Sequence, residues 1–153
     1  MFADPLTARI AGFLESIGIP VSAATLDHPT FLPGVHISRG GLLADPARLT
    51  WPGDLLHEAG HLAVMEPARR AATEGSAGDN GGEEMAAIAW SYAAALAIPI
   101  EPELVFHSGG YQTGGSSLIE NFRAGRTIGV PLLQWMGLTT SAAYPAMTRW
   151  LRE

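Results

Sequence analysis

The chain contains no cysteine and no lysine, because all nine of its basic residues are arginine. The absence of cysteine excludes thiol nucleophiles, disulfides, iron–sulfur clusters and cysteine-ligated zinc sites. The absence of lysine excludes a Schiff-base lysine and a phosphate-loop lysine. The chemistry of this chain must therefore come from His, Asp, Glu, Ser, Thr, Tyr or Arg side chains, or from a metal ion that nitrogen and oxygen atoms hold.

Basic residues are also few and scattered. The 153 residues carry a formal net charge of -6 and no basic block, which argues against nucleic acid or an anionic membrane as the main partner. The length fits one domain over residues 1–153 with a core of its own. The N-terminus lacks the features of a signal peptide, and the most apolar stretch, 85–100, is shorter than a typical membrane span. We therefore expect a cytoplasmic protein, and the sequence carries no pattern that indicates an oligomeric state.

Apolar spacing and the positions of proline and glycine predict both helices and strands, hence an α+β fold. The predicted helices cover residues 5–17, 52–66, 83–98, 117–125 and 141–152, and residues 68–82 are predicted to be a loop. A strand is predicted at Val35–Ser38, and a second short strand after Gly41. His36 is expected to face solvent on its strand, and His28 lies in the preceding loop.

The most specific motif is His57-Glu58-Ala59-Gly60-His61, which fits the pattern HExxH. On a helix, side chains four residues apart lie on nearly the same face, so both imidazoles can reach one ion. Glu58 lies one step round the helix, where it can take a proton from a metal-bound water. Ala59 and Gly60 have little or no side chain, so another element can approach the helix closely. The alternative interpretation is a helix that carries two histidines by coincidence.

This motif resembles that of the zincin metallopeptidases. Metzincins extend it to HExxHxxGxxH, whereas Val64 and Pro67 stand at the two additional positions here. The chain is more similar to the gluzincins, which include thermolysin and the compact minigluzincins. Over residues 54–98 the resemblance implies a zincin-like α+β fold, in which a small and mostly antiparallel sheet packs on an active-site helix and a glutamate helix. It also implies a Zn²⁺ cofactor, a peptide or protein substrate, and hydrolysis of an amide bond.

The third zinc ligand of a gluzincin is a glutamate on the following helix, which here implies Glu83 or Glu84. Both fit the E-x-x-A pattern of such helices, and Trp90 favours Glu84 because an aromatic residue often stands six positions after the ligand. Neither glutamate is followed by the Asp or Asn that orients a ligating histidine in gluzincins. Asp54 or a backbone carbonyl would have to take this role. Asp79 is a rival ligand, although its Gly-Asp-Asn-Gly surroundings fit a turn equally well.

The resemblance also implies roles outside the motif. Thermolysin-like enzymes stabilise the developing oxyanion with a downstream Tyr and His, which makes His107 and Tyr111 candidates. A packed tyrosine and a histidine with a structural partner are the alternative interpretation of these two residues. Zincins also have an edge strand above the active helix, to which an extended substrate adds, and the strand at 35–38 is expected to fill this place.

Two functions follow as hypotheses. The first is a zinc metallopeptidase in which Glu58 acts as the general base. The second is a zincin-like binding or regulatory module in which the ion is structural or lost. The missing Asp or Asn after the third ligand favours the second hypothesis.

Overall fold

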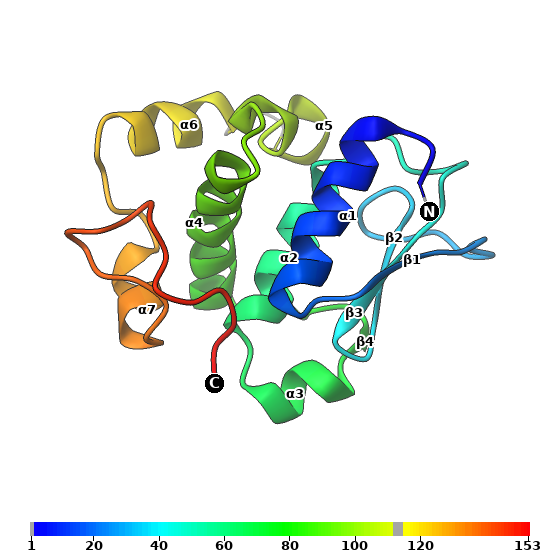
Figure 1. The fold of residues 1–153 in the computed structure, drawn as a ribbon, viewed down its shortest axis with the longest axis horizontal. Coiled ribbons are helices and arrows are strands. Elements are labelled where there is room, and N and C mark those ends of the chain that lie inside the picture. The colour runs from blue at the N-terminus through cyan, green and yellow to red at the C-terminus, as the bar shows by residue number, and fades with distance from the viewer. Residues whose placement is uncertain (1, 112–114) are drawn as a thin grey trace.

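The structure, a computed structural model, describes residues 2–111 and 115–153, with the backbone alone at 110 and 111. It is an α+β fold, as the sequence predicts, with the sheet on one side of a central helix and a second long helix on the other (Figure 1). The strands are β1 (Val21–Ala23), β2 (Val35–Ser38), β3 (Gly41–Ala44) and β4 (Glu74–Gly75). The helices are α1 (Pro5–Ile17), α2 (Asp54–Val64), α3 (Pro67–Ala72), α4 (Gly81–Ala97), α5 (Ser108–Tyr111), α6 (Gly115–Arg123) and α7 (Val130–Trp135), with a 3₁₀ turn at Pro102–Leu104.

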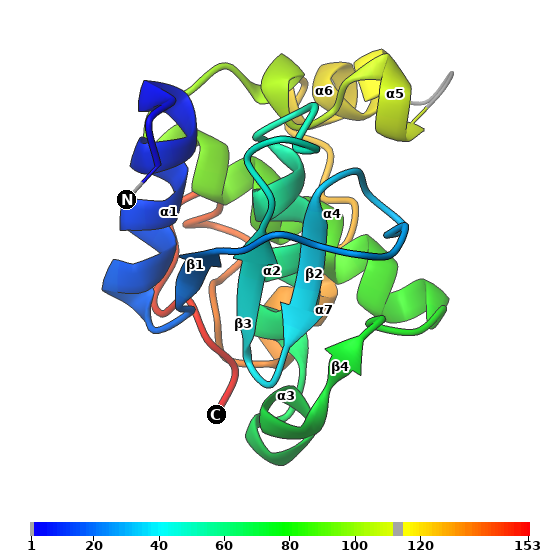
Figure 2. The same ribbon diagram turned by 90° about the vertical axis from the view of Figure 1, so that its right-hand side faces the viewer.

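The sheet is mixed, with strand order β1-β3-β2-β4. β1 runs parallel to β3, whereas β2 is antiparallel to both β3 and β4. The buried Val35 and Ile37 of β2 alternate with His36 and Ser38, so one face of the strand packs inward and the other faces outward. The side view shows β2 and β3 in front of α2 (Figure 2).

The expectation that residues 35–38 form the edge strand is wrong. The two-residue β4 pairs with Ile37 and Ser38 and takes the edge position instead. This pairing joins positions that are far apart in the sequence, and no local pattern marks it.

Helix α2 is buried along its whole length, because the sheet and α1 lie on one side of it and α4 on the other. The helix-to-helix contact with α4 is close. A Cβ atom built on Gly60 would lie 2.8 Å from the carbonyl oxygen of Ala87, closer than real Cβ atoms approach such an atom. The missing side chain at Gly60 therefore lets α4 approach α2, as the sequence predicts. This approach brings the first turn of α4 next to the two histidines of α2.

Residues 68–82, expected to be a loop, contain α3 and β4. Pro67 both follows α2 and occupies the first position of α3, where its missing N–H costs nothing. The Arg70 side chain then donates to the carbonyl oxygens of Leu62 and Met65 at 2.8 and 3.0 Å. These two bonds add side-chain partners for backbone carbonyls at and just after the end of α2, where intrahelical donors run out.

The predicted helix at 141–152 is also wrong, because the segment consists of turns and bends. Pro145 has no N–H to donate within a helix. Other backbone groups of the segment bond to distant partners: Thr148 donates to Leu138 at 2.8 Å, and Arg152 donates to Ala63 at 2.9 Å. The apolar spacing around Tyr144 and Trp150 therefore reflects packing on the core and not helical periodicity. A helix that the sequence did not indicate, α7, precedes this segment.

Along the described parts of the chain, none of the helices combines the length with the apolar character that crossing a membrane requires.

Candidate metal centre

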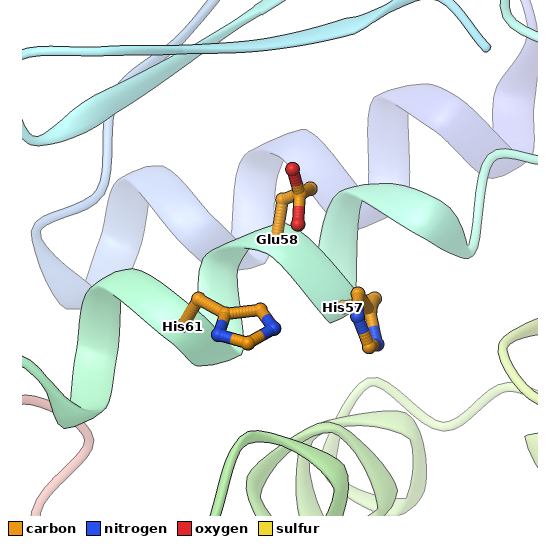
Figure 3. Close-up of side chains that lie close together, drawn as sticks. All are labelled: His57, Glu58 and His61. Atoms are coloured by element: carbon orange, nitrogen blue, oxygen red, sulfur yellow. The ribbon is translucent and has the colours of Figure 1, made fainter. Parts of the chain in front are cut away.

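Three side chains of α2 form a compact group of metal-ligating type (Figure 3). His57, Glu58 and His61 are all buried, and each offers one ligand atom within 4.8 Å of the others. The two imidazole rings lie with their centroids 5.0 Å apart and their planes at 73°. The HExxH motif of the sequence is therefore a real cluster on one helix, and it is a possible site for a metal ion.

The carboxylate of Glu84 lies against both histidines. Its Oε1 is 3.4 Å from Nε2 of His57, and its Oε2 is 2.8 Å from Nε2 of His61. Glu84 belongs to the first turn of α4, which Asn80 caps by accepting the N–H of Glu83 at 2.9 Å. Two imidazole nitrogens and a carboxylate thus converge between α2 and α4.

Glu83 and Asp79 lie in other surroundings. The carboxylate of Glu83 forms an ion pair with Arg69 of α3. Asp79 is exposed in the loop before α4, and it is not in the group of potential ligands on α2. The structure thus brings Glu84, and neither of these two alternatives, to the nitrogen atoms of the histidines.

Burial and neighbouring charges shift the pKa values of these groups in different directions. Burial raises the pKa of Glu58 to about 7, and it lowers the pKa of His57 to about 4. Burial also acts to lower the pKa of His61, but the hydrogen bond and the charge of Glu84 outweigh it and raise the pKa. The hydrogen bond to His61 in turn lowers the pKa of Glu84. At neutral pH His57 is therefore neutral and can offer a lone pair to a cation.

His107 approaches the N-terminal end of α2 from the segment after α4. Its Nε2 lies 2.6 Å from Oδ1 of Asp54, and its ring stacks on Trp51 with centroids 4.4 Å apart. The other carboxylate oxygen of Asp54, Oδ2, is buried and has no hydrogen-bond partner in the described part of the chain. Burial raises the pKa of Asp54. The sequence offered Asp54 as a group that could orient a ligating histidine, whereas this bond goes to His107. The side chain of Tyr111 lies outside the described residues.

A cleft of about 740 Å³ opens beside the group of potential ligands. Glu58, His61 and Glu84 form one part of its wall, and residues 75–79 with Gly81 form another. Phe31, whose side chain is 90% exposed, lies at this cleft as well. No sequence pattern indicates Phe31 or the contact between His107 and Asp54, because both depend on segments that meet only in the folded chain.

Comparisons with protein-family models, with curated proteins and with solved structures found no match for this chain. The resemblance to zincins therefore rests on the residues of the motif and on the geometry that the fold gives them.

Proposed function

We propose that this protein is a zinc-dependent metallopeptidase of the gluzincin type, which hydrolyses amide bonds in a peptide or protein substrate. The observation that carries the proposal is the convergence of His57, His61 and Glu84 on one point, beside the buried Glu58 and next to a cleft. His57, His61 and Glu84 would hold the ion.

The donor set suits zinc. Two imidazole nitrogens and one carboxylate are the three protein ligands of many catalytic zinc sites, which leave a fourth position open. His57 is neutral at physiological pH, as a ligand must be, and the proton that His61 shares with Glu84 would be released when an ion binds. A zinc ion held by these residues would lower the pKa of a bound water and polarise a substrate carbonyl.

Glu58 is the residue that moves the proton. Its carboxylate lies beside the histidines and borders the cleft, so a water molecule in the cleft is within its reach. Because burial raises its pKa to about 7, the carboxylate is a better proton acceptor than an exposed glutamate. Glu58 would take a proton from the attacking water and then donate it to the leaving amine nitrogen.

His107 has a supporting role in this proposal. The bond to Asp54 and the stacking on Trp51 fix its ring at the N-terminal end of α2. His107 also acts electrostatically on His57. The family resemblance implies that His107 stabilises negative charge on the substrate, and its fixed position near His57 supports this assignment.

Metal content combined with hydrolysis tests the proposal. The wild-type protein and the variants His61→Ala, Glu84→Ala and Glu83→Ala are loaded with zinc, and bound metal is counted by plasma mass spectrometry. We expect His61→Ala and Glu84→Ala each to lose one zinc relative to wild type, and Glu83→Ala to keep it. A mixed library of fluorogenic peptides then reports hydrolysis, which a hydroxamate should inhibit.

Equal zinc loss in the Glu83 and Glu84 variants would contradict the assignment of Glu84 as the third ligand. Zinc bound as expected, with no hydrolysis and no hydroxamate binding, would favour the binding or regulatory module over the enzyme, because a closed structural site has no open position for an inhibitor.

A further inference from the structure

A second pair of histidines lies on the outer face of the sheet, outside the candidate metal centre. His36 projects from β2 on the face opposite the buried Ile37, and His28 belongs to the segment between β1 and β2. Nε2 of His28 lies 3.2 Å from Nδ1 of His36. His36 lies on the outward face of its strand, as the sequence predicts, but its side chain is only 14% exposed and contacts His28 and Glu74.

In each ring, the nitrogen that does not face the other ring is hydrogen-bonded to a carboxylate. Nδ1 of His28 lies 2.9 Å from Oδ1 of Asp27, and Nε2 of His36 lies 2.6 Å from Oε2 of Glu74. An ionised carboxylate carries no proton and can only accept a hydrogen bond. Each ring must donate its N–H to its carboxylate. When both rings are neutral, the two nitrogens that face each other carry lone pairs, and at 3.2 Å these repel unless a proton or a metal ion lies between them.

The spacing fits a metal ion between the rings. Two imidazoles on one tetrahedral ion, with metal–nitrogen distances of about 2.0–2.1 Å, place their nitrogens about 3.3–3.4 Å apart. The ring centroids lie 5.0 Å apart with the planes at 79°, whereas the corresponding values for His57 and His61 are 5.0 Å and 73°. The second pair thus has the same ring separation as the candidate metal ligands of α2 and a similar angle between the ring planes.

We propose that His28 and His36 form a second metal site, which binds a divalent transition ion such as Zn²⁺ through Nε2 and Nδ1. Asp27 and Glu74 orient the rings, in the carboxylate–histidine–metal arrangement that is general among metalloproteins. Two imidazole ligands favour zinc, copper or nickel over magnesium or calcium, which prefer oxygen. The negative charge of the two carboxylates adds to the attraction for a cation.

The segment that carries His28 is held in place before any ion binds. Asp45 accepts the N–H of Leu26 at 3.0 Å, and Arg48 donates to the carbonyl oxygen of His28 at 3.2 Å. The turn after β3 therefore fixes the backbone on which His28 stands. Less ordering is then needed when the two imidazoles close on an ion, which favours binding.

The second metal site would connect the segment that borders the cleft to strand β2 of the sheet. Phe31, which borders the cleft next to Glu58, stands three residues after His28 in the same segment. An ion bound by His28 and His36 would join this segment to β2 by a direct bond. The second site thus acts as a clamp on the side of the cleft that Phe31 forms.

Zinc titration of the full chain tests the proposal. The protein is stripped of metal, titrated with Zn²⁺ against a chromophoric competitor, and compared with His28→Ala, His36→Gln and His61→Ala. Ser38→Ala is the matched control, because it removes a hydroxyl that donates to Glu74 at 3.3 Å but keeps both imidazoles. We expect two zinc ions per wild-type chain and per Ser38→Ala chain. We expect one ion in each His28 and His36 variant, and circular dichroism verifies that every variant is folded.

The outcomes separate the two proposals. If wild type binds one ion that His61→Ala loses and His28→Ala keeps, the second site is overturned, and the pair is held by a shared proton. If wild type binds one ion that His28→Ala loses and His61→Ala keeps, the second site stands and the proposed peptidase centre falls. As an independent readout, Zn²⁺ should shift the ¹⁵N resonances of His28 Nε2 and His36 Nδ1, and unmoved resonances would contradict the proposal.

Discussion

The two histidine pairs of this protein share a geometry but lie in opposite surroundings. His57 and His61 stand one helical turn apart on a buried helix, whereas His28 and His36 join a loop to a strand, and the side chain of His28 is 45% exposed. Ring separations are the same in the two pairs.

The carboxylates differ in position. Glu84 stands at the nitrogens that would hold the ion, next to Glu58, whereas the carboxylates of the second pair bond to the far ring nitrogens. The ring separation does not distinguish the two pairs, because it is the same in both. The position of the carboxylates does distinguish them, and only the buried pair has a carboxylate placed to act as a proton acceptor.

The largest expected effect concerns the carboxylate that only the buried pair has. Replacing Glu58 by Gln removes the proton acceptor but keeps the shape of the side chain, so hydrolysis should fall by about 10²–10⁴-fold. Zinc content should not change, because His57, His61 and Glu84 remain. Rates on fluorogenic peptides and metal analysis measure the two quantities. Glu15→Gln, at an exposed position of α1, is the control. An unchanged rate in Glu58→Gln would remove the mechanism.

The next effect concerns the packing that creates the buried pair. Gly60→Ala introduces a Cβ at the contact with Ala87, so α4 must move away from α2. We expect the free energy of unfolding to fall by about 1–3 kcal/mol, as for other overpacked cores. Urea denaturation measures this change. Gly12→Ala on α1 is the matched control, because no atom lies within 4 Å of a Cβ built there. Zinc affinity of the buried pair should fall in Gly60→Ala, and affinity of the exposed pair should not change.

A smaller effect distinguishes the two pairs by their access to solvent. His28 and His36 offer two protein ligands, whereas His57 and His61 together with Glu84 offer three. The exposed pair should therefore release zinc at the lower chelator concentration. A titration of the zinc-loaded protein with a chelator, followed by metal analysis, should show two steps. The first step should be absent in His28→Ala. A single step in the wild-type protein would mean that the two pairs do not differ in this way.

The smallest effect concerns the turn that supports the exposed pair. The N–H of Leu26 bonds to Asp45 and holds the pKa of its carboxyl below the ordinary value of 3.8. Because this pKa is lower in the folded than in the unfolded chain, Asp45 stabilises the fold above pH 3.8. This contribution is lost as the pH falls through that value toward the pKa of the folded state.

Asp45→Ala should therefore lose stability at neutral pH and show a shallower decline between about pH 5 and pH 3. Thermal denaturation across this range provides the measurement. Zinc affinity should fall at the exposed pair alone. A decline in stability at low pH as steep as that of the wild-type protein would contradict the assigned role of Asp45.

Local patterns in the sequence predicted the elements that carry the buried site. The helix predicted at 5–17 is α1 as well, and the structure shows Asp4 accepting the N–H of Thr7 at 2.9 Å at its start and Gly18 at a φ of 103° at its end. The i, i+4 spacing of His57 and His61 placed both rings on one face of α2. These features are local, since a helix fixes the relative positions of its own side chains.

Long-range contacts explain the errors. The pairing of β4 with β2 and the turns at 141–152 depend on backbone partners that are distant in the sequence. Helix α3 has a distant contact as well, because its Arg70 donates to the carbonyl oxygen of Arg152. The same holds for the choice between Glu83 and Glu84. Both lie in the first turn of α4 and fit the same pattern, but the packing of α4 on α2 directs Glu84 to the histidines and Glu83 to Arg69.

The sequence by itself determined the α+β composition, the chemistry left open to a chain without cysteine or lysine, and the pair of histidines on α2. The tertiary structure alone decided which carboxylate meets that pair, which strand forms the edge, and that His28 and His36 lie side by side. The physical reason is the distance along the sequence between the residues that interact. Helical spacing is set by the backbone within a few residues, whereas these contacts arise only when packing brings distant segments together.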